Sequence, residues 1–438
     1  MLAQPACTAL SERDQQFFYA RHLWQCAFDA LSAACGAGLL TSDFRQDYTD
    51  LGRGVLTLIG LLGALAYLFA TLSAMRRWAP SDLLVPGSAV VAVFFVGLQL
   101  VVAGAAWVAL RAATEEPVAL EPVWLATAAF ASLGWARPAV GVESWLCAAI
   151  AGASAFGWPV WLLLFAAWRR TLGGARTFGR LALGYLVYLV ALAVAVSVLE
   201  SPRGAAQPGA GASMVAQAWP ARLGRAAVQV VSAAGAGIAT EDLTDSGLRE
   251  GTKVVLVVLV LVGGFFGCAA GGVTWILAVS ALRGRPPIPP REPRRGTKDG
   301  AFPSPGAEPR GCDDVLALAR GTLAALRVLI GLLTTTVVAA LGMILIETLT
   351  ASRFQPAPTF ADALVDAASA VCGGGLTTGV TELVTGRNLI KGIGLGMDQY
   401  QVGMAWIMLC MVAGRVLPIA VLANATTPPV RSGSVTPS

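Results

Sequence analysis

The stretch that decides the fold is Ser369–Gly379, which reads Ser-Ala-Val-Cys-Gly-Gly-Gly-Leu-Thr-Thr-Gly. It ends a short helical pattern, Phe360 to Val371, and precedes a long apolar segment, Leu389 to Ala423, that contains Arg415. Glycines that stop a short helix at membrane depth leave backbone carbonyls without helical partners, and lipid cannot satisfy them. Such a turn must line water or bind an ion, as rings of backbone carbonyls do in potassium pores. The stretch therefore predicts a cation pore.

The composition places the chain in a lipid bilayer. Of its 438 residues, 56% are hydrophobic and only 13% are charged, and the mean hydropathy is +0.67. Soluble domains carry roughly 25% charged residues. Several apolar runs reach the roughly 20 residues that a transmembrane helix needs, and no alternating pattern of a membrane barrel occurs. We expect an all-α integral membrane protein that crosses the cell membrane several times.

Charge and cysteine patterns exclude other classes of protein. The net charge of +5 comes from arginines in short loops beside the spans, which are topology signals rather than a nucleic-acid surface. The eight cysteines form no CxxC pair, and His22 is the one histidine, so no zinc site or disulfide framework is predicted. No Ser/His/Asp set or phosphate-binding loop is placed for catalysis. We therefore expect neither an enzyme nor a covalently bound cofactor.

One plan recurs four times along the chain: a span, a short pore helix, a small-residue turn and another span. The first unit lacks the leading span. The arginine clusters all fall on one predicted side, which positive-inside bias makes cytoplasmic, so the four turns face outward. The turns are Gly36-Ala37-Gly38, Ser132-Leu133-Gly134, Gly235-Ala236-Gly237 and Gly373-Gly374-Gly375.

The repeat divides the chain into seven segments. The missing span of the first unit means either that the true start lies upstream or that lipid or a partner fills its place. The segments are 1–23 (polar N-terminal segment), 24–77 (first unit), 78–170 (second unit), 171–282 (third unit), 283–312 (cytoplasmic loop rich in Pro, Gly and Arg), 313–425 (fourth unit) and 426–438 (a tail expected to be disordered).

Two further features lie outside the turns. The apolar run from Val254 to Leu282 is interrupted by the glycine-rich stretch from Gly263 to Gly272. Each glycine costs a helix interior about 1 kcal/mol relative to alanine, so this stretch favours unwound backbone. Arg415 lies in the last span, and an intramembrane arginine is a functional candidate by default. The alternative for Arg415 is a side chain that snorkels to the cytoplasmic interface.

Taken together, these motifs resemble the Trk/Ktr/HKT superfamily of potassium transporters. Ser369 to Gly379 and Ser232 to Asp242 look like its fourth and third filter turns, Ser32 to Gly38 like the first, and Ala128 to Trp135, the weakest, like the second. The resemblance implies four units around a central pore, with potassium held at the carbonyls of the four turns. It also implies an intramembrane gate made of Gly263, Gly264, Gly267, Gly271, Gly272 and the pore-facing Arg415.

The same resemblance implies channel-like potassium transport driven by the membrane potential. Its members work as homodimers with a cytoplasmic nucleotide-binding regulatory ring, so both partners are expected here. Two departures leave alternatives open. The turns are poor in side-chain oxygens, so sodium remains an alternative ion. After the glycine-rich stretch, Thr274 and Trp275 stand where the family usually has a lysine or arginine. The alternative function is a degenerate, non-conducting membrane scaffold or regulatory subunit.

Overall fold

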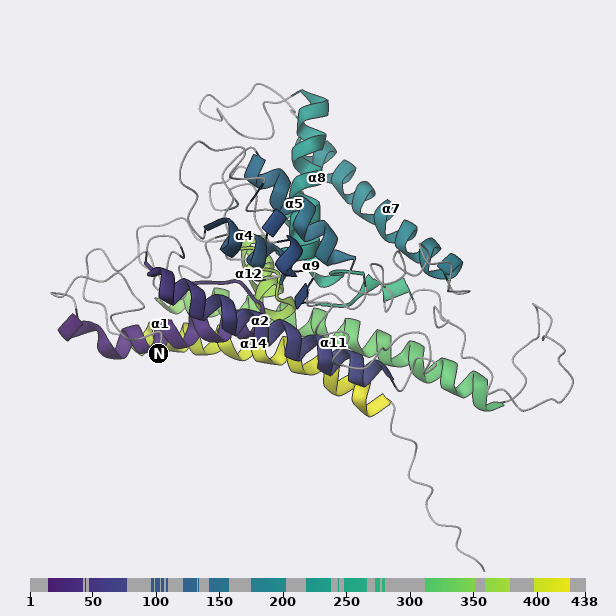
Figure 1. Cartoon of the computed structure of the whole chain (residues 1–438). Coiled ribbons are helices and arrows are strands. Elements are labelled where there is room, and N and C mark those ends of the chain that lie inside the picture. The colour runs from purple at the N-terminus through teal and green to yellow at the C-terminus, as the bar shows by residue number, and fades with distance from the viewer. Residues whose placement is uncertain are drawn as a thin grey trace, which may run out of the picture.

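A computed structural model shows an all-α membrane protein made of long helices and of shorter ones that pack against them (Figure 1). Several predicted features lie outside the described residues: Ser132, Gly134, Gly267, Gly271, most of the stretch 78–120 in the second unit, the loop 283–311 and the tail 426–438. The structure describes residues 15–41, 44, 47–76, 96–97, 99–102, 104–105, 108, 121–131, 133, 142–156, 175–201, 218–237, 243, 248–265, 272–275, 278–279, 312–350, 359–378 and 398–425.

Within those residues, four helices are long and apolar enough to cross a bilayer. Leucines and valines on their outer faces are exposed, as expected of side chains that meet lipid. Figure 1 shows α14 running beside α11 and α2, and it contacts both. The four helices are α2 (Asp50–Arg76), α7 (Ala175–Leu199), α11 (Cys312–Thr350) and α14 (Asp398–Ala425).

The four predicted pore helices are all present: α1 (Gln15–Cys35), α4 (Glu121–Phe130), α8 (Trp219–Ala236) and α12 (Phe360–Cys372). Helix α1 begins at Gln15, so part of the predicted polar N-terminal segment 1–23 is helical. Helix α12 lies centrally in Figure 1, against α9, α11 and α14. Its residues from Val365 to Cys372 are all buried, and most are small, which lets neighbouring backbones approach closely.

Two shorter helices complete the described fold, α5 (Val142–Ala155) and α9 (Glu250–Leu261). The predicted interruption of the third unit's last span is where α9 ends, at Leu261, and a helical turn returns at Trp275. The end at Leu261 is what the run of glycines after it favours, since glycine is a poor residue for a helix interior.

Glycines mark the closest approaches between helices. A Cβ on Gly63 of α2 would lie only 2.7 Å from the carbonyl carbon of Ala34 at the end of α1. In the fourth unit, a Cβ on Gly414 of α14 would lie 2.5 Å from the carbonyl carbon of Val371 at the end of α12. Real Cβ atoms do not come this close, so glycine is required at both positions. The span after the turn thus packs on the end of its pore helix in the same way in units one and four.

Candidate functional site

The ends of the four pore helices share one backbone arrangement. In each, the N–H that follows the helix donates to a carbonyl five residues earlier, as in a Schellman cap. The glycines Gly36, Gly373 and Gly237 adopt the left-handed conformation that such a cap needs, with φ of 60°, 68° and 63°. The bonds run from Ala37 to Ser32 (2.8 Å), Leu133 to Ala128 (2.9 Å), Gly374 to Ser369 (2.9 Å) and Gly237 to Ser232.

The third turn differs from the prediction. Gly235 and Ala236 are the last residues of α8 rather than part of the loop, and Gly237 is the C-cap. The left-handed glycine therefore comes one residue later after Ser232 than Gly373 does after Ser369. The reason is a close contact with α5: a Cβ on Gly235 would lie 2.5 Å from the carbonyl carbon of Ala151, so this glycine serves helix packing.

The first, third and fourth turns meet at one place. The Gly375 N–H donates to the Ala37 carbonyl at 2.8 Å, joining the fourth turn to the first. A Cβ on Gly373 would lie 2.9 Å from the Gly36 oxygen, and one on Gly237 would lie 2.8 Å from the Cα of Gly374. Six predicted filter residues are thus neighbours across three units: Gly36, Ala37, Gly237, Gly373, Gly374 and Gly375. Gly38, with φ of 68°, directly follows Ala37.

The described residue of the second turn, Leu133, makes a different contact. Its buried side chain packs against Gly60 of α2, where an added Cβ would lie 2.5 Å from a Leu133 methyl group. The preceding helix α4 is tied to α5, because the Ser154 hydroxyl donates to the Phe130 carbonyl at 2.5 Å. Helix α4 also contacts α8. The role of every turn residue in ion selection stays a prediction.

Arg415 lies between the ends of α1 and α12. Its Nε donates to the Cys35 carbonyl, and its guanidinium carbon stands 4.3 Å from the centre of the Tyr67 ring. The guanidinium also borders Gly373, where a side chain would collide with it. A cation at the C-terminal ends of two helices is electrostatically favourable. Arg415 therefore contacts the base of the first and fourth turns, and its predicted hold on the gate loop stays a prediction.

In the predicted gate region, the backbone after α9 leaves the helical path and hydrogen-bonds back to the segment 261–264. Val273 N–H donates to the Leu261 carbonyl at 2.8 Å, and Trp275 N–H to the Gly264 carbonyl at 3.0 Å. Gly272 has a φ of 79°, and a Cβ there would lie 2.7 Å from the Leu261 oxygen. Broken helices are tolerated at membrane depth when protein satisfies the freed backbone groups, as it does at these positions.

Aromatic side chains pack around this break. The Tyr185 hydroxyl lies 3.4 Å from the Gly263 carbonyl, and its ring lies 5.9 Å from that of Phe265. Trp275 stacks on Tyr188 at 4.9 Å between ring centres. Trp275 therefore packs the segment after α9 against α7. It is one of the two residues at the place where the family resemblance implies a lysine or arginine.

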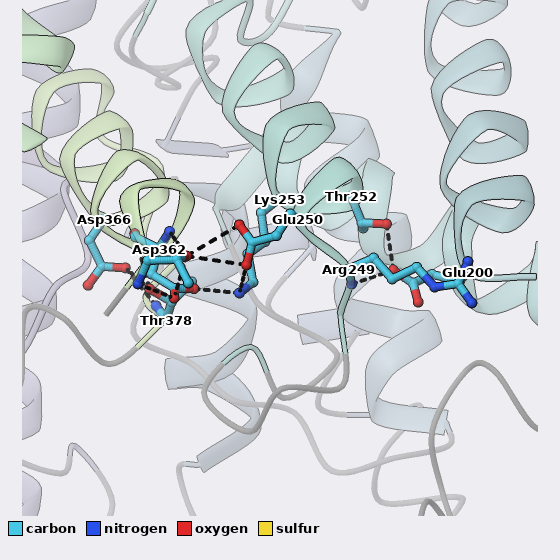
Figure 2. Close-up of polar contacts among 9 residues, drawn as sticks. Glu200, Arg249, Glu250, Thr252, Lys253, Asp362, Asp366 and Thr378 are labelled. Atoms are coloured by element: carbon cyan, nitrogen blue, oxygen red, sulfur yellow. Dashed lines mark hydrogen bonds and ion pairs between the residues drawn. The ribbon is translucent and has the colours of Figure 1, made fainter. Parts of the chain in front are cut away.

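A polar cluster joins the N-terminal ends of α9 and α12 (Figure 2). The Lys253 ammonium lies 2.6 Å from the Asp362 carboxylate and 3.2 Å from that of Glu250. Thr359 and Asp362 form a capping box at the start of α12, and the Thr359 hydroxyl also bonds to Glu250 at 3.2 Å. Asp362 lies outside the four candidate spans. Burial alone would raise the pKa of its carboxyl, but hydrogen bonds from Lys253 and Thr359 outweigh burial and lower it.

A second carboxylate caps α9. Glu200, fully buried after the end of α7, accepts from the Arg249 N–H at 3.0 Å and the Thr252 hydroxyl at 2.5 Å (Figure 2). The Arg249 guanidinium in turn donates to the Leu199 carbonyl at 2.8 Å. The negative charge at a helix N-terminus complements the helix dipole. These contacts fix the position at which α9 begins.

Asp29 and Asp366 are the residues that the sequence reasoning missed. Both are fully buried, and both bind the threonine that follows their turn, Thr41 or Thr378. The signal was available, because residues 29–41 and 366–378 share the frame Asp-Ala-x-Ser-Ala-x-Cys-Gly-x-Gly-Leu-x-Thr. No group of three or more His, Cys, Asp or Glu suited to a metal ion occurs among the described residues.

Comparison with known proteins places this arrangement in a known architecture. No family model and no curated protein sequence matches the chain. A solved structure, the potassium transporter TrkH from Vibrio parahaemolyticus, matches with a TM-score of 0.56 over 93% of this chain and 78% of that chain. The chain has the fold of this transporter. The sequence identity is 16%, so the likeness concerns the fold alone. It confirms the resemblance on which the fold prediction rested, an all-α membrane protein of Trk-like architecture.

Proposed function

We propose that this chain transports potassium or another monovalent cation along a path formed where its pore turns meet. The observation that supports this most is the contact among the first, third and fourth turns in a chain with the fold of a potassium transporter. The transport is channel-like and driven by the membrane potential, and the protein resides in the plasma membrane with the four turns on the outer side.

The electrostatics of the turns suit a cation. Helices α1, α8 and α12 end at this meeting point, and each helix C-terminus carries a partial negative charge of roughly half an elementary unit. Backbone carbonyls in a turn can replace the hydration shell of a potassium ion. Gly36, Gly237 and Gly373 supply the left-handed backbone on which such turns depend. The filter proposed here consists of the turn residues named above.

The gate is proposed to lie in the backbone break after α9, together with Arg415. The guanidinium is a fixed positive charge beside Gly373 and the Cys35 carbonyl, so it raises the barrier that a cation meets there. The partners proposed are those that the family resemblance implies: a second copy of the chain, and a cytoplasmic nucleotide-binding ring that docks on the basic loops.

One observation favours the alternative, a non-conducting scaffold or regulatory subunit. The Ala37 carbonyl accepts a hydrogen bond from Gly375, and the Gly374 backbone lies against Gly237. A carbonyl oxygen that accepts a hydrogen bond from a neighbouring turn coordinates a cation less strongly, because the hydrogen bond and the cation compete for the same oxygen.

Ion flux separates the two functions. The purified chain in liposomes should take up rubidium, a potassium tracer, under an imposed inside-negative potential, and should restore growth at low potassium to bacteria that lack their own uptake systems. Gly375→Val, which forces a β-branched residue into a φ of 63°, should abolish both. Gly179→Val, at an exposed position of α7 with no atom within 4 Å of the added Cβ, is the matched control. Well-folded protein with neither flux nor rescue would leave the scaffold function standing.

A further inference from the structure

We propose that Asp29 and Asp366 are a matched pair of positioning residues that fix the far ends of the first and fourth turns and so set which monovalent cation the turns prefer. The proposal rests on the proposed transport function and concerns what holds the filter in shape. Neither carboxylate belongs to the predicted filter or gate.

In the first unit, Asp29 projects from α1 one turn before Ser32 and is fully buried. One carboxylate oxygen accepts from the Thr41 N–H at 2.7 Å and from the Thr41 hydroxyl at 2.9 Å. The other accepts from the Tyr48 hydroxyl at 2.6 Å. The chain that leaves the turn is thereby bonded back to the pore helix that entered it.

The fourth unit repeats this arrangement. Asp366, also fully buried, accepts from the Thr378 N–H at 2.6 Å and from the Thr378 hydroxyl at 3.0 Å. Its other oxygen accepts from the Thr377 hydroxyl at 2.9 Å, and Figure 2 shows Asp366 facing Thr378. The Ser369 hydroxyl adds a bond from the Leu376 N–H at 3.0 Å within the same loop.

A buried carboxylate with several donors is a strong and specific restraint. Bonds to an ionised acceptor are shorter and about twice as strong as neutral ones. Removing the charge from water is expensive unless such donors meet it, so these carboxylates hold their threonines firmly. Each turn is then fixed twice, by the helix cap at its start and by the carboxylate at its end. Turns made of glycine and alanine need this restraint, because their own side chains provide none.

The other two units lack the carboxylate. The positions one turn before Ala128 and Ser232 hold Leu125 and Gln229. Both are buried, so neither position is open to solvent. Among the described residues, a carboxylate is seen to hold the end of a turn in units one and four, whose turns are also joined directly through Gly375 and Ala37.

The test compares Asp29→Asn, Asp366→Asn and the double variant in liposomes, with the potassium-to-sodium flux ratio as the readout. Asparagine keeps the size and one acceptor oxygen but loses the charge. Each single variant should lower the ratio by up to about tenfold, the factor that corresponds to one charge-assisted hydrogen bond, and the double variant should lower it further than either single variant. Asp50→Asn, a solvent-exposed carboxylate at the start of α2, is the control and should leave the ratio unchanged.

Equal ratios in wild type and all variants, at matched amounts of folded protein, would overturn the proposal while leaving transport intact. If an aspartate variant does not fold, Thr41→Val and Thr378→Val remove only the hydroxyl and should lower the ratio in the same direction. If the wild type carries no ion, the transport function fails, and hydrogen exchange tests the restraint alone. The amides of Thr41 and Thr378 should then exchange at least tenfold faster in the asparagine variants, and unchanged exchange would overturn the proposal.

Discussion

Replacing Gly414 by alanine tests the closest approach between a span and a pore helix. The new Cβ would lie 2.5 Å from the carbonyl carbon and 2.7 Å from the Cα of Val371, well inside the 3.0 Å that real Cβ atoms keep. The obstacle is backbone, so no side chain can rotate away, and α14 must move off α12. Overpacking of this kind costs about 1–3 kcal/mol and sometimes more. Because the contact is with backbone, we expect a cost at the upper end of this range, about 3 kcal/mol. Alanine returns about 1 kcal/mol of helix propensity, which leaves a net loss of about 2 kcal/mol.

The assay is thermal unfolding of the detergent-solubilised protein, followed by intrinsic fluorescence. Gly179→Ala on α7 is the matched control, because a Cβ there has no neighbour within 4 Å. It should gain up to about 1 kcal/mol from helix propensity alone. The reasoning is refuted if Gly414→Ala unfolds at the wild-type temperature, or if the two variants lose stability equally. Loss of the neighbouring contact from Arg415 to the Cys35 carbonyl should accompany the shift of α14.

Three further predictions concern the polar contacts and the turns. Lys253→Met leaves the Asp362 carboxylate without its cation and should cost about 2 kcal/mol in unfolding free energy, between the values for exposed and buried pairs. The pKa of Asp362 is lowered in the folded state, so its ion pair stabilises the protein above about pH 4, the ordinary pKa of the group, and this stabilisation is lost as the pH falls below that. Unfolding measured as a function of pH should therefore show the difference in unfolding free energy between wild type and Lys253→Met disappearing below about pH 4. Arg415→Gln should raise cation flux in liposomes by removing the fixed charge, whereas Arg415→Lys keeps the charge and should not. Gly237→Ala should reduce the yield of folded protein on size-exclusion chromatography, because φ is 63° and the Cβ would meet Gly374; a normal yield would contradict this contact.

The sequence predicted the repeat and its elements because their signals are local. Apolar length identifies the spans, and a small-residue turn after a short apolar run identifies the end of a pore helix. Helix α12 was predicted to end at Val371 and ends at Cys372, and α9 ends just before the glycines that were expected to break it. These features depend on neighbours in the chain, which a sequence displays directly.

Contacts between distant segments could not be read in the same way. The third turn begins later than predicted because Gly235 packs on Ala151, and nothing in the local sequence separates a packing glycine from a turn glycine. The Arg415 contact with Cys35 joins residues 380 positions apart. Asp29 and Asp366 were within reach, since the two thirteen-residue frames could have been compared position by position; a buried acid in a pore helix is unusual enough to demand donors.

The backbone hydrogen bond between Gly375 and Ala37 has a mechanical consequence. It links the fourth turn to the first at 2.8 Å, so that a displacement of one is transmitted directly to the other. The first and fourth turns therefore move together, and separating them would require this bond to break.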